Sequence, residues 1–448
     1  MKTNFIRYIV FVILACSAGF LGSCKDDEGH NAGSPVIVNR FYPTSGSAGT
    51  EILITGKNFT TNVDEVSVMV GNIPLTILNC DMNNIIAVIP ARMGDGPLKV
   101  SIAGREPVTS IETFVYSFAA NVSTFAGNGE VGYQDGKGTD VMFYFDVTTM
   151  DSETWKYGPW QRSSMCVDDK GNVYVGEAGN LCLRKITPSG EVSTLAGFAG
   201  QRGYTDGAGL QARFSTFYGM DIDAEGNIYV TETGNNTIRR ITQEGVVNTL
   251  GNANNQPWCL AVDKRNGDIY YSRTGDNVQQ GGIWKFVQDG NDIQVSSSST
   301  LGLAVDAEGN LYAADQDVHG IAKYTTTDGA TWERTVLVGN GVAEYTDGPF
   351  ESARFANPDG LAVGPDGNIY VAGNGAYAGG DNPDQSIRVL DMQNRVVRTV
   401  AGSSLAGYND ANGTTAAFNG PEDVAVDKDG VIYVLDRRNN VVRKIVYE

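Results

Sequence analysis

The sequence predicts an all-β protein in which a small β-sandwich is followed by a six-bladed β-propeller. Length is the first observation, because 448 residues are too many for one ordinary domain. Composition is the second: 55 glycines without a collagen-like period, together with many Val, Ile and Tyr, are typical of short strands joined by tight turns. The third is a unit that recurs six times in residues 119–448, as the repeats of a propeller do.

Charge and histidine content exclude several classes of function. The chain has 33 Lys and Arg against 52 Asp and Glu, a formal net charge of −19, whereas nucleic-acid binding requires a basic surface. His30 and His319 are the only histidines, which leaves little support for a His–metal centre or for general acid–base catalysis by histidine. The sequence contains no GxSxG, HExxH or P-loop motif. We therefore expect a protein that is not an enzyme and that requires no cofactor.

The first residues have the pattern of a targeting signal. Lys2 and Arg7 precede an apolar run at 9–20 that is too short for a comfortable membrane span. The run ends in Leu-Gly-Ser followed by Cys24, which resembles a bacterial lipoprotein signal: residues 1–23 would be removed and Cys24 lipidated. An ordinary secretory cleavage site with a chance cysteine is the alternative.

Residues 24–34 are expected to be an acidic tether and linker. The run Lys-Asp-Asp-Glu at 25–28 resembles the export tag of Bacteroidetes-type surface lipoproteins. That resemblance implies an outer-membrane, lipid-anchored protein that faces the cell exterior. A simple solvated tether is the alternative.

The remaining cysteines predict neither a disulfide scaffold nor a zinc site. Cys80, Cys166, Cys182 and Cys259 are widely spaced and form no CxxC pair. The last three lie at apolar strand positions, where a free cysteine is usually a small core residue. A bridge between Cys166 and Cys182 stays open as an alternative.

Residues 35–118 predict an immunoglobulin-like sandwich. Val66, Val68 and Val70 alternate as in a half-buried strand, and further strands at 85–89 and 98–102 are bounded by Gly, Pro or Asn. The segments that carry a family resemblance are 41–50, 54–59, 88–90 and 114–116. They resemble the IPT/TIG family, which implies a spacer in a surface lipoprotein, and no catalytic constellation occurs among them.

Each repeat of residues 119–448 reads as an apolar pair, Val-Asp, a Gly-Asn turn, an apolar-Tyr-apolar strand and a basic strand. The copies begin at Met165, Met220, Leu260, Leu303, Leu361 and Val424. A fourth strand is clear in several copies, and four strands per unit make a propeller blade. The units resemble NHL repeats. A solenoid is the alternative, although a parallel β-helix has shorter periods.

The two ends of the repeat region predict how the ring closes. The last copy ends after its third strand, and an orphan fourth strand, 122–127, precedes the first copy. Pairing these strands would remove the open sheet edge and give six blades.

Long loops fall on one rim of this propeller, where binding sites usually lie. Four of them share a Tyr-x-Asp pattern at 133–135, 204–206, 345–347 and 408–410, each followed by a Phe. We interpret these four as self-packing loops in which Asp caps a turn. The first long loop also contains Trp155, Tyr157 and Trp160, which do not repeat.

Those aromatic residues, with Tyr377 and Asp381 from another loop on the same rim, form the candidate ligand site. Aromatic faces beside carboxylates suit sugars. The alternative is that Trp155 and Trp160 seal the sandwich–propeller interface or plug the channel.

Four carboxylates are weak candidates for a metal site, with calcium as the possible ion. They end the second strands of four blades: Glu177, Glu232, Asp315 and Asp436. The alternative is that they cap neighbouring backbone at the strand ends.

The sequence favours a non-catalytic cell-surface binding protein. Resemblance to lipoproteins of this build implies a polysaccharide or oligosaccharide ligand captured for uptake. A surface protein–protein scaffold is the alternative, and a calcium-dependent lyase or hydrolase is the third hypothesis.

Overall fold

The computed structural model describes residues 34–447 except 48, 72, 91–94, 117–119, 148–161, 254–255, 274–280, 289 and 374–383. The chain divides into two compact units, Met1–Ser117 and Phe118–Glu448. The all-β prediction is confirmed, because the described elements are strands and short 3-10 turns. None of the helical segments in these ranges has the length and apolarity that crossing a bilayer requires.

The first unit is a sandwich of two sheets. One sheet has the order β1(Ile37–Tyr42), β3(Glu51–Lys57), β7(Asn84–Val88), β6(Thr76–Cys80). The other has the order β2(Ser45–Gly46), β9(Val108–Tyr116), β8(Gly96–Ile102), β4(Val66–Val70), β5(Ile73–Pro74). Val66, Val68 and Val70 of β4 are buried and alternate with outward residues, as the sequence predicted. The inward faces of the two sheets form one apolar core.

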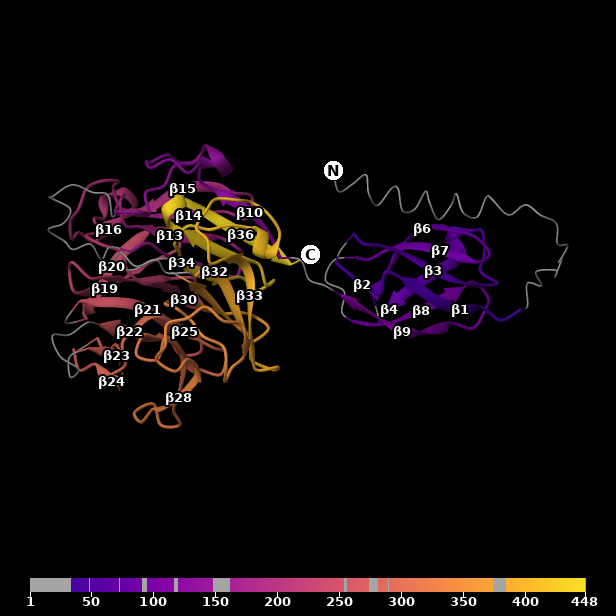
Figure 1. The fold of residues 1–448 in the computed structure, drawn as a ribbon. Helices are drawn as coiled ribbons and strands as arrows, with labels where there is room; N and C mark the ends of the chain where they lie inside the picture. Colours follow the sequence, from indigo (N-terminus) through magenta and orange to yellow (C-terminus); the bar gives the residue numbers. More distant parts are fainter. Residues whose placement is uncertain are drawn as a thin grey trace. The chain divides into compact units, whose positions relative to one another are not determined.

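The second unit contains six sheets over the described residues, here called blades one to six (Figure 1). Blades one and two consist of β12(Ser164–Val167), β13(Val173–Glu177), β14(Cys182–Ile186), β15(Glu191–Ala196) and of β17(Met220–Ile222), β18(Ile228–Glu232), β19(Thr237–Ile241), β20(Val246–Asn252). Blades three and four consist of β21(Pro257–Asp263), β22(Asp268–Arg273), β23(Gly282–Lys285), β24(Ile293–Ser296) and of β25(Thr300–Val305), β26(Leu311–Asp315), β27(Gly320–Thr325), β28(Glu333–Val338). Blades five and six consist of β30(Pro358–Val363), β31(Ile369–Gly373), β32(Gln385–Asp391), β33(Val396–Ser403) and of β34(Pro421–Val426), β35(Ile432–Asp436), β36(Val441–Tyr447), β10(Ala120–Ala126).

The first strands of the blades form a ring. In chain order β12, β17, β21, β25, β30 and β34 each contact the next, and β34 contacts β12. Apolar clusters fill the space between neighbouring blades; one such cluster joins Val175 of blade one, and Phe143 from the segment before that blade, to Leu435 of blade six. This arrangement is the propeller that the repeats predicted.

A carboxylate closes the turn between the first two strands of a blade. Asp168 accepts hydrogen bonds from the backbone N–H groups of Lys170 and Asn172 and from the hydroxyl of Tyr174. In blade five, where Gly364 replaces this Asp, Asp366 accepts from the Tyr370 hydroxyl instead. The Gly-Asn turn and the Tyr of the repeat therefore belong to one local hydrogen-bonded unit.

The ring closes through the strand that precedes the first repeat. Strand β10 pairs antiparallel with β36, with Val122 opposite Ile445, and Figure 1 shows the two side by side. Thr124 of β10 donates its backbone N–H to Asp410, and its hydroxyl bonds to that of Tyr408. The predicted closure is thus confirmed.

Candidate functional site

A fully buried arginine lies in the third strand of four blades. In blade six, Arg443 lies between two aromatic rings, 5.1 Å from the Phe418 centroid and 5.0 Å from that of Tyr408. Its guanidinium bonds to Asp410 at 2.7 Å and to Asp436 at 2.8 Å. The equivalent arginines of blades one, two and five have the same kind of aromatic neighbours and are Arg184, Arg239 and Arg388.

The four candidate metal ligands are each bound to an arginine. Glu177 lies 2.6 Å from Arg184, Glu232 lies 3.0 Å from Arg239, and Asp436 lies 2.8 Å from Arg443. In blade four, Asp315 pairs at 2.6 Å with Arg334 of the outer strand. A guanidinium in this position opposes the binding of a metal cation.

These carboxylates also cap backbone, as the alternative interpretation held. Glu177 accepts from the N–H of Tyr144, and Asp436 accepts from that of Asn419. The structure brings none of the four together, and no group of three potential metal-ligating side chains occurs in the described ranges.

The Tyr-x-Asp loops pack on their own blades, as the sequence predicted, but the prediction that their Asp caps a turn is wrong, because its bonds reach distant strands of the blade. Each loop Asp bonds to the buried arginine and accepts the N–H of a threonine on the outer strand; Asp135 does so with Arg184 and Thr194. Three of the loops add a short fifth strand outside the blade: β11(Gly136–Lys137), β16(Gly207–Ala208) and β29(Gly348–Pro349). The Phe that follows each motif is fully buried between blades.

Arg162 links the starts of the first strands of several blades. It precedes blade one and is 5% exposed, yet it donates hydrogen bonds to the carbonyl oxygens of Leu301 in blade four and Glu422 in blade six. It also forms ion pairs with Asp359 of blade five and with the Glu422 carboxylate, and it lies over the ring of Tyr218. One side chain thus links the first strands of three blades across the channel.

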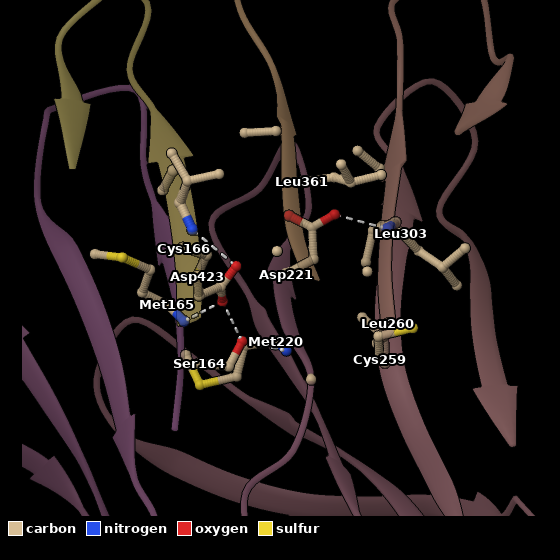
Figure 2. A pocket seen from close by; sticks show the side chains of 18 of the residues that line it. Ser164, Met165, Cys166, Met220, Asp221, Cys259, Leu260, Leu303, Leu361 and Asp423 are labelled. Carbon is tan, nitrogen blue, oxygen red and sulfur yellow. Dashed lines mark hydrogen bonds between the residues drawn. The ribbon is translucent and has the colours of Figure 1, made fainter. Parts of the chain in front are cut away.

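Arg162 and the first strands line a pocket of about 130 Å³ (Figure 2). Figure 2 shows Asp423 of blade six bonded to blade one, where it accepts from the Ser164 hydroxyl at 2.7 Å and the Met165 N–H at 2.9 Å. Asp221 of blade two accepts the N–H of Val262 in blade three. Desolvation in the channel raises the pKa of Asp423 to about 6, despite these bonds and the nearby Arg162.

The elevated pKa predicts that protonation of Asp423 stabilises the fold. Because the folded pKa lies above the value of 3.8 for an ordinary Asp, this contribution is complete below pH 3.8 and is lost as pH rises through about 6. Comparing wild type with Asp423→Asn by urea unfolding, we expect the stability difference to shift in favour of wild type by on the order of 1–2 kcal/mol between pH 7 and pH 4. A difference that does not change with pH would refute the assignment.

The sequence-predicted ligand and lipidation residues lie outside the described residues: Cys24, Trp155, Tyr157, Trp160, Tyr377 and Asp381. Two described residues that flank these loops are both linked to β30. Arg162 follows the first loop and pairs with Asp359, while Gly373 precedes the second loop and is the strand partner of Pro358. One flanking residue of each loop is therefore linked to the start of β30.

The structure also identifies residues that sequence reasoning missed. Arg162 and Asp423 each link blades through contacts between distant segments, and no local pattern marks either one. The buried arginines could have been found from the sequence, because an arginine occurs in the third strand of each blade that has a Tyr-x-Asp loop. Blades three and four lack the loop and have Trp284 and Ala322 at the equivalent position. The cysteines at 80, 166, 182 and 259 are free and buried, so Cys166 and Cys182 are not bridged.

Two family models match parts of the chain. An IPT/TIG domain matches residues 35–116, and an NHL repeat matches residues 418–445. Among curated proteins, the chain is 27% identical over 262 residues to Protein SUPPRESSOR OF QUENCHING 1, chloroplastic, of Arabidopsis thaliana, covering 56% of this chain and 21% of that protein. It is 26% identical over 203 residues to NHL repeat-containing protein 3 of Homo sapiens, covering 42% of this chain and 50% of that protein. The chain thus spans half or less of the length of these two relatives.

Solved structures resemble nearly the whole chain. A structural genomics protein of unknown function from Bacteroides thetaiotaomicron has a TM-score of 0.59 and 22% identity, covering 95% of this chain and all of that one. An auxiliary nutrient binding protein from Bacteroides ovatus has a TM-score of 0.55 and 21% identity, and one from Bacteroides thetaiotaomicron has 0.56 and 21%. Each of these two alignments covers 93% of this chain and 99% of the Bacteroides chain. At these identities the likeness establishes the shared fold.

Proposed function

We propose that the protein is a non-catalytic, lipid-anchored surface protein that binds a polysaccharide for uptake. The observation that carries this proposal is the shared fold with two Bacteroides proteins described as auxiliary nutrient binding proteins, over 93% of this chain. The anchor would be Cys24, on the outer face of an outer membrane, with the acidic tether and the sandwich as spacers.

The proposed ligand site is the rim of long loops. Trp155, Tyr157 and Trp160 belong to the loop that ends at Arg162, and Tyr377 and Asp381 belong to the loop that begins after Gly373. This proposal is supported by the flanking residues, since Arg162 pairs with Asp359 and Gly373 is the strand partner of Pro358, both at the start of β30. Aromatic faces stack on the C–H faces of sugars, and carboxylates accept bonds from their hydroxyl groups.

Several described residues support a binder over an enzyme. His319 bonds through Nδ1 to the carbonyl oxygen of Ala356, in a structural role. The carboxylates at the strand ends are paired with arginines, and burial raises the pKa of the Cys166 and Cys259 thiols, which suppresses their reactivity.

A protein–protein scaffold is the second candidate, favoured by one observation. The outer strands β24 and β28 are the last of their sheets, with no fifth strand beside them in the described part of the chain. Unpaired strand edges are sites where an extended segment of a partner can add.

Native affinity electrophoresis of residues 25–448 against a panel of polysaccharides tests the proposal. We expect at least one polymer to retard the protein and Trp155→Ala/Trp160→Ala to bind it at least tenfold more weakly, a loss of about 1.4 kcal/mol. The control is Ile111→Ala, which removes a 97% exposed apolar side chain from the sandwich. Failure of every polymer to retard the wild-type chain would contradict the proposal and favour the scaffold.

A further inference from the structure

Exposed apolar side chains of the propeller unit gather in the four Tyr-x-Asp loops. Tyr133, Tyr204 and Tyr408 are 44%, 52% and 52% exposed. Val131, Val342 and Leu405, each two or three residues before the tyrosine of its loop, are also exposed. The buried Phe and the bonded Asp already pack each loop on its blade, so the exposed ring surface is not needed for that packing.

The tyrosine rings are held in fixed orientations. Beneath each ring lies the guanidinium of the buried arginine, at 5.1 Å for Tyr133, 5.5 Å for Tyr204 and 5.0 Å for Tyr408. The hydroxyl of Tyr133 bonds to that of Thr194 at 2.7 Å, and the hydroxyl of Tyr408 bonds to that of Thr124 at 2.8 Å. A ring ordered in the free protein loses little conformational entropy when a ligand stacks on it.

A carboxylate lies beside each ring. The side chains of Asp135, Asp206 and Asp410 are 44%, 46% and 46% exposed, although each bonds to its arginine on the inner side. Their outward surfaces can accept hydrogen bonds from hydroxyl groups. They repel anionic polymers, as does the net charge of −19. Ring and carboxylate together suit an uncharged sugar.

The loops follow one another around the ring. They belong to blades five, six, one and two, whose first strands β30, β34, β12 and β17 contact each other in that order. Blades three and four, which lack the loops, interrupt the series. The tyrosines at 345, 408, 133 and 204 therefore lie on four successive blades, and this series is here called the tyrosine arc. Tyr345 is half-buried, whereas the other three are exposed.

We propose that the tyrosine arc is a second binding surface, multivalent and specific for a neutral polysaccharide. Each tyrosine–aspartate pair holds one short stretch of sugar, and a long polymer engages several pairs at once. Weak single contacts then add up through the high effective concentration of the neighbouring sites. This inference rests on the proposed function, and it assigns polymer binding to residues other than the tryptophans.

The test measures binding of residues 25–448 to a soluble galactomannan, an arabinoxylan, a mixed-linkage β-glucan and the anionic polygalacturonan, each also as a short oligosaccharide. Single, double and triple alanine variants are made at Tyr133, Tyr204 and Tyr408. We expect each substitution to weaken polymer binding about threefold to tenfold, cumulatively, with a much smaller effect on the oligosaccharide.

Two controls separate ring stacking from folding. Tyr133→Phe/Tyr408→Phe keeps the rings and should retain binding, and Ile293→Ala removes a 37% exposed apolar side chain from blade three, away from the arc. A second measurement needs no variant: saturating polymer should protect Tyr133, Tyr204 and Tyr408 of the wild-type chain from nitration, as read by mass spectrometry.

Several outcomes would overturn the inference. A folded triple variant that binds polymer like wild type, or tyrosines nitrated equally with and without polymer, would do so. If binding were then lost only in Trp155→Ala/Trp160→Ala, the proposed function would stand without the arc. Retention of polygalacturonan above the neutral polymers would refute the neutral class. Binding to none of the polymers would refute both proposals.

Discussion

Replacing Arg443 with alanine is expected to lower the free energy of unfolding of the propeller unit by about 3–5 kcal/mol. The Asp436 carboxylate is fully buried, and the substitution would leave it without its cationic partner. The Asp410 carboxylate, which also holds the backbone of Thr124, would lose the same partner. A cavity would open between the rings of Phe418 and Tyr408 as well.

Urea unfolding at pH 7, followed by circular dichroism, measures this effect. The matched control is Arg395→Ala, because Arg395 also pairs with a carboxylate and lies over an aromatic ring, but on the surface. Its side chain is 58% exposed and that of its partner Glu351 is 69% exposed, so we expect a loss below about 1 kcal/mol. Equal losses in the two variants would show that burial of the Arg443 cluster does not matter.

Removing β10 is expected to be at least as damaging, because this strand closes the ring. A chain that begins at residue 128 lacks the strand, whereas one that begins at residue 118 retains it. The loss exposes the edge of β36 and leaves Asp410 and Tyr408 without their bonds to Thr124. Burial of the Val122 side chain alone contributes roughly 1.5–3 kcal/mol.

Thermal unfolding of the two truncated chains tests this expectation. The chain from 118 should unfold in one cooperative transition, whereas the chain from 128 should unfold at a much lower temperature or fail to fold. Adding a peptide of residues 118–127 to the shorter chain should restore part of the difference, since it supplies the missing strand. If both truncated chains unfold alike, pairing between β10 and β36 does not hold the ring.

Much of the fold could be predicted because its determinants are local and repeated. The alternation at Val66, Val68 and Val70 identifies a half-buried strand within a few residues. In the Asp–Gly-Asn–Tyr unit, one carboxylate closes one turn through local hydrogen bonds. Each copy of Asp168 in the sequence therefore predicts the first turn of one blade. Even the closure by β10 could be inferred, because a fourth strand was missing at one end of the repeats and in excess at the other.

The candidate site was less predictable because its contacts join distant segments. Periodicity predicts which face of its strand a side chain lies on, but it does not predict which residue of another strand that side chain contacts. No sequence pattern marks Arg162, because its partners lie far away in the sequence, at residues 301, 359 and 422. The strand-end carboxylates were considered for calcium because the sequence showed the acids at equivalent positions and did not show that Arg184 and Arg443 point at them.

The closing strand also determines the order in which the molecule can be made. Thr124 and Asp410 bond across 286 residues of sequence, and β10 cannot pair until β36, which follows the strands of blades one to five in the chain, has been synthesised. Blades one to five are built from segments that follow one another in the chain, so they can form during synthesis, whereas blade six cannot. Closing so large a loop is entropically costly, so completion of the ring is the late step of folding. Until then, the edge of β36 is unpaired and can form hydrogen bonds with a non-native strand.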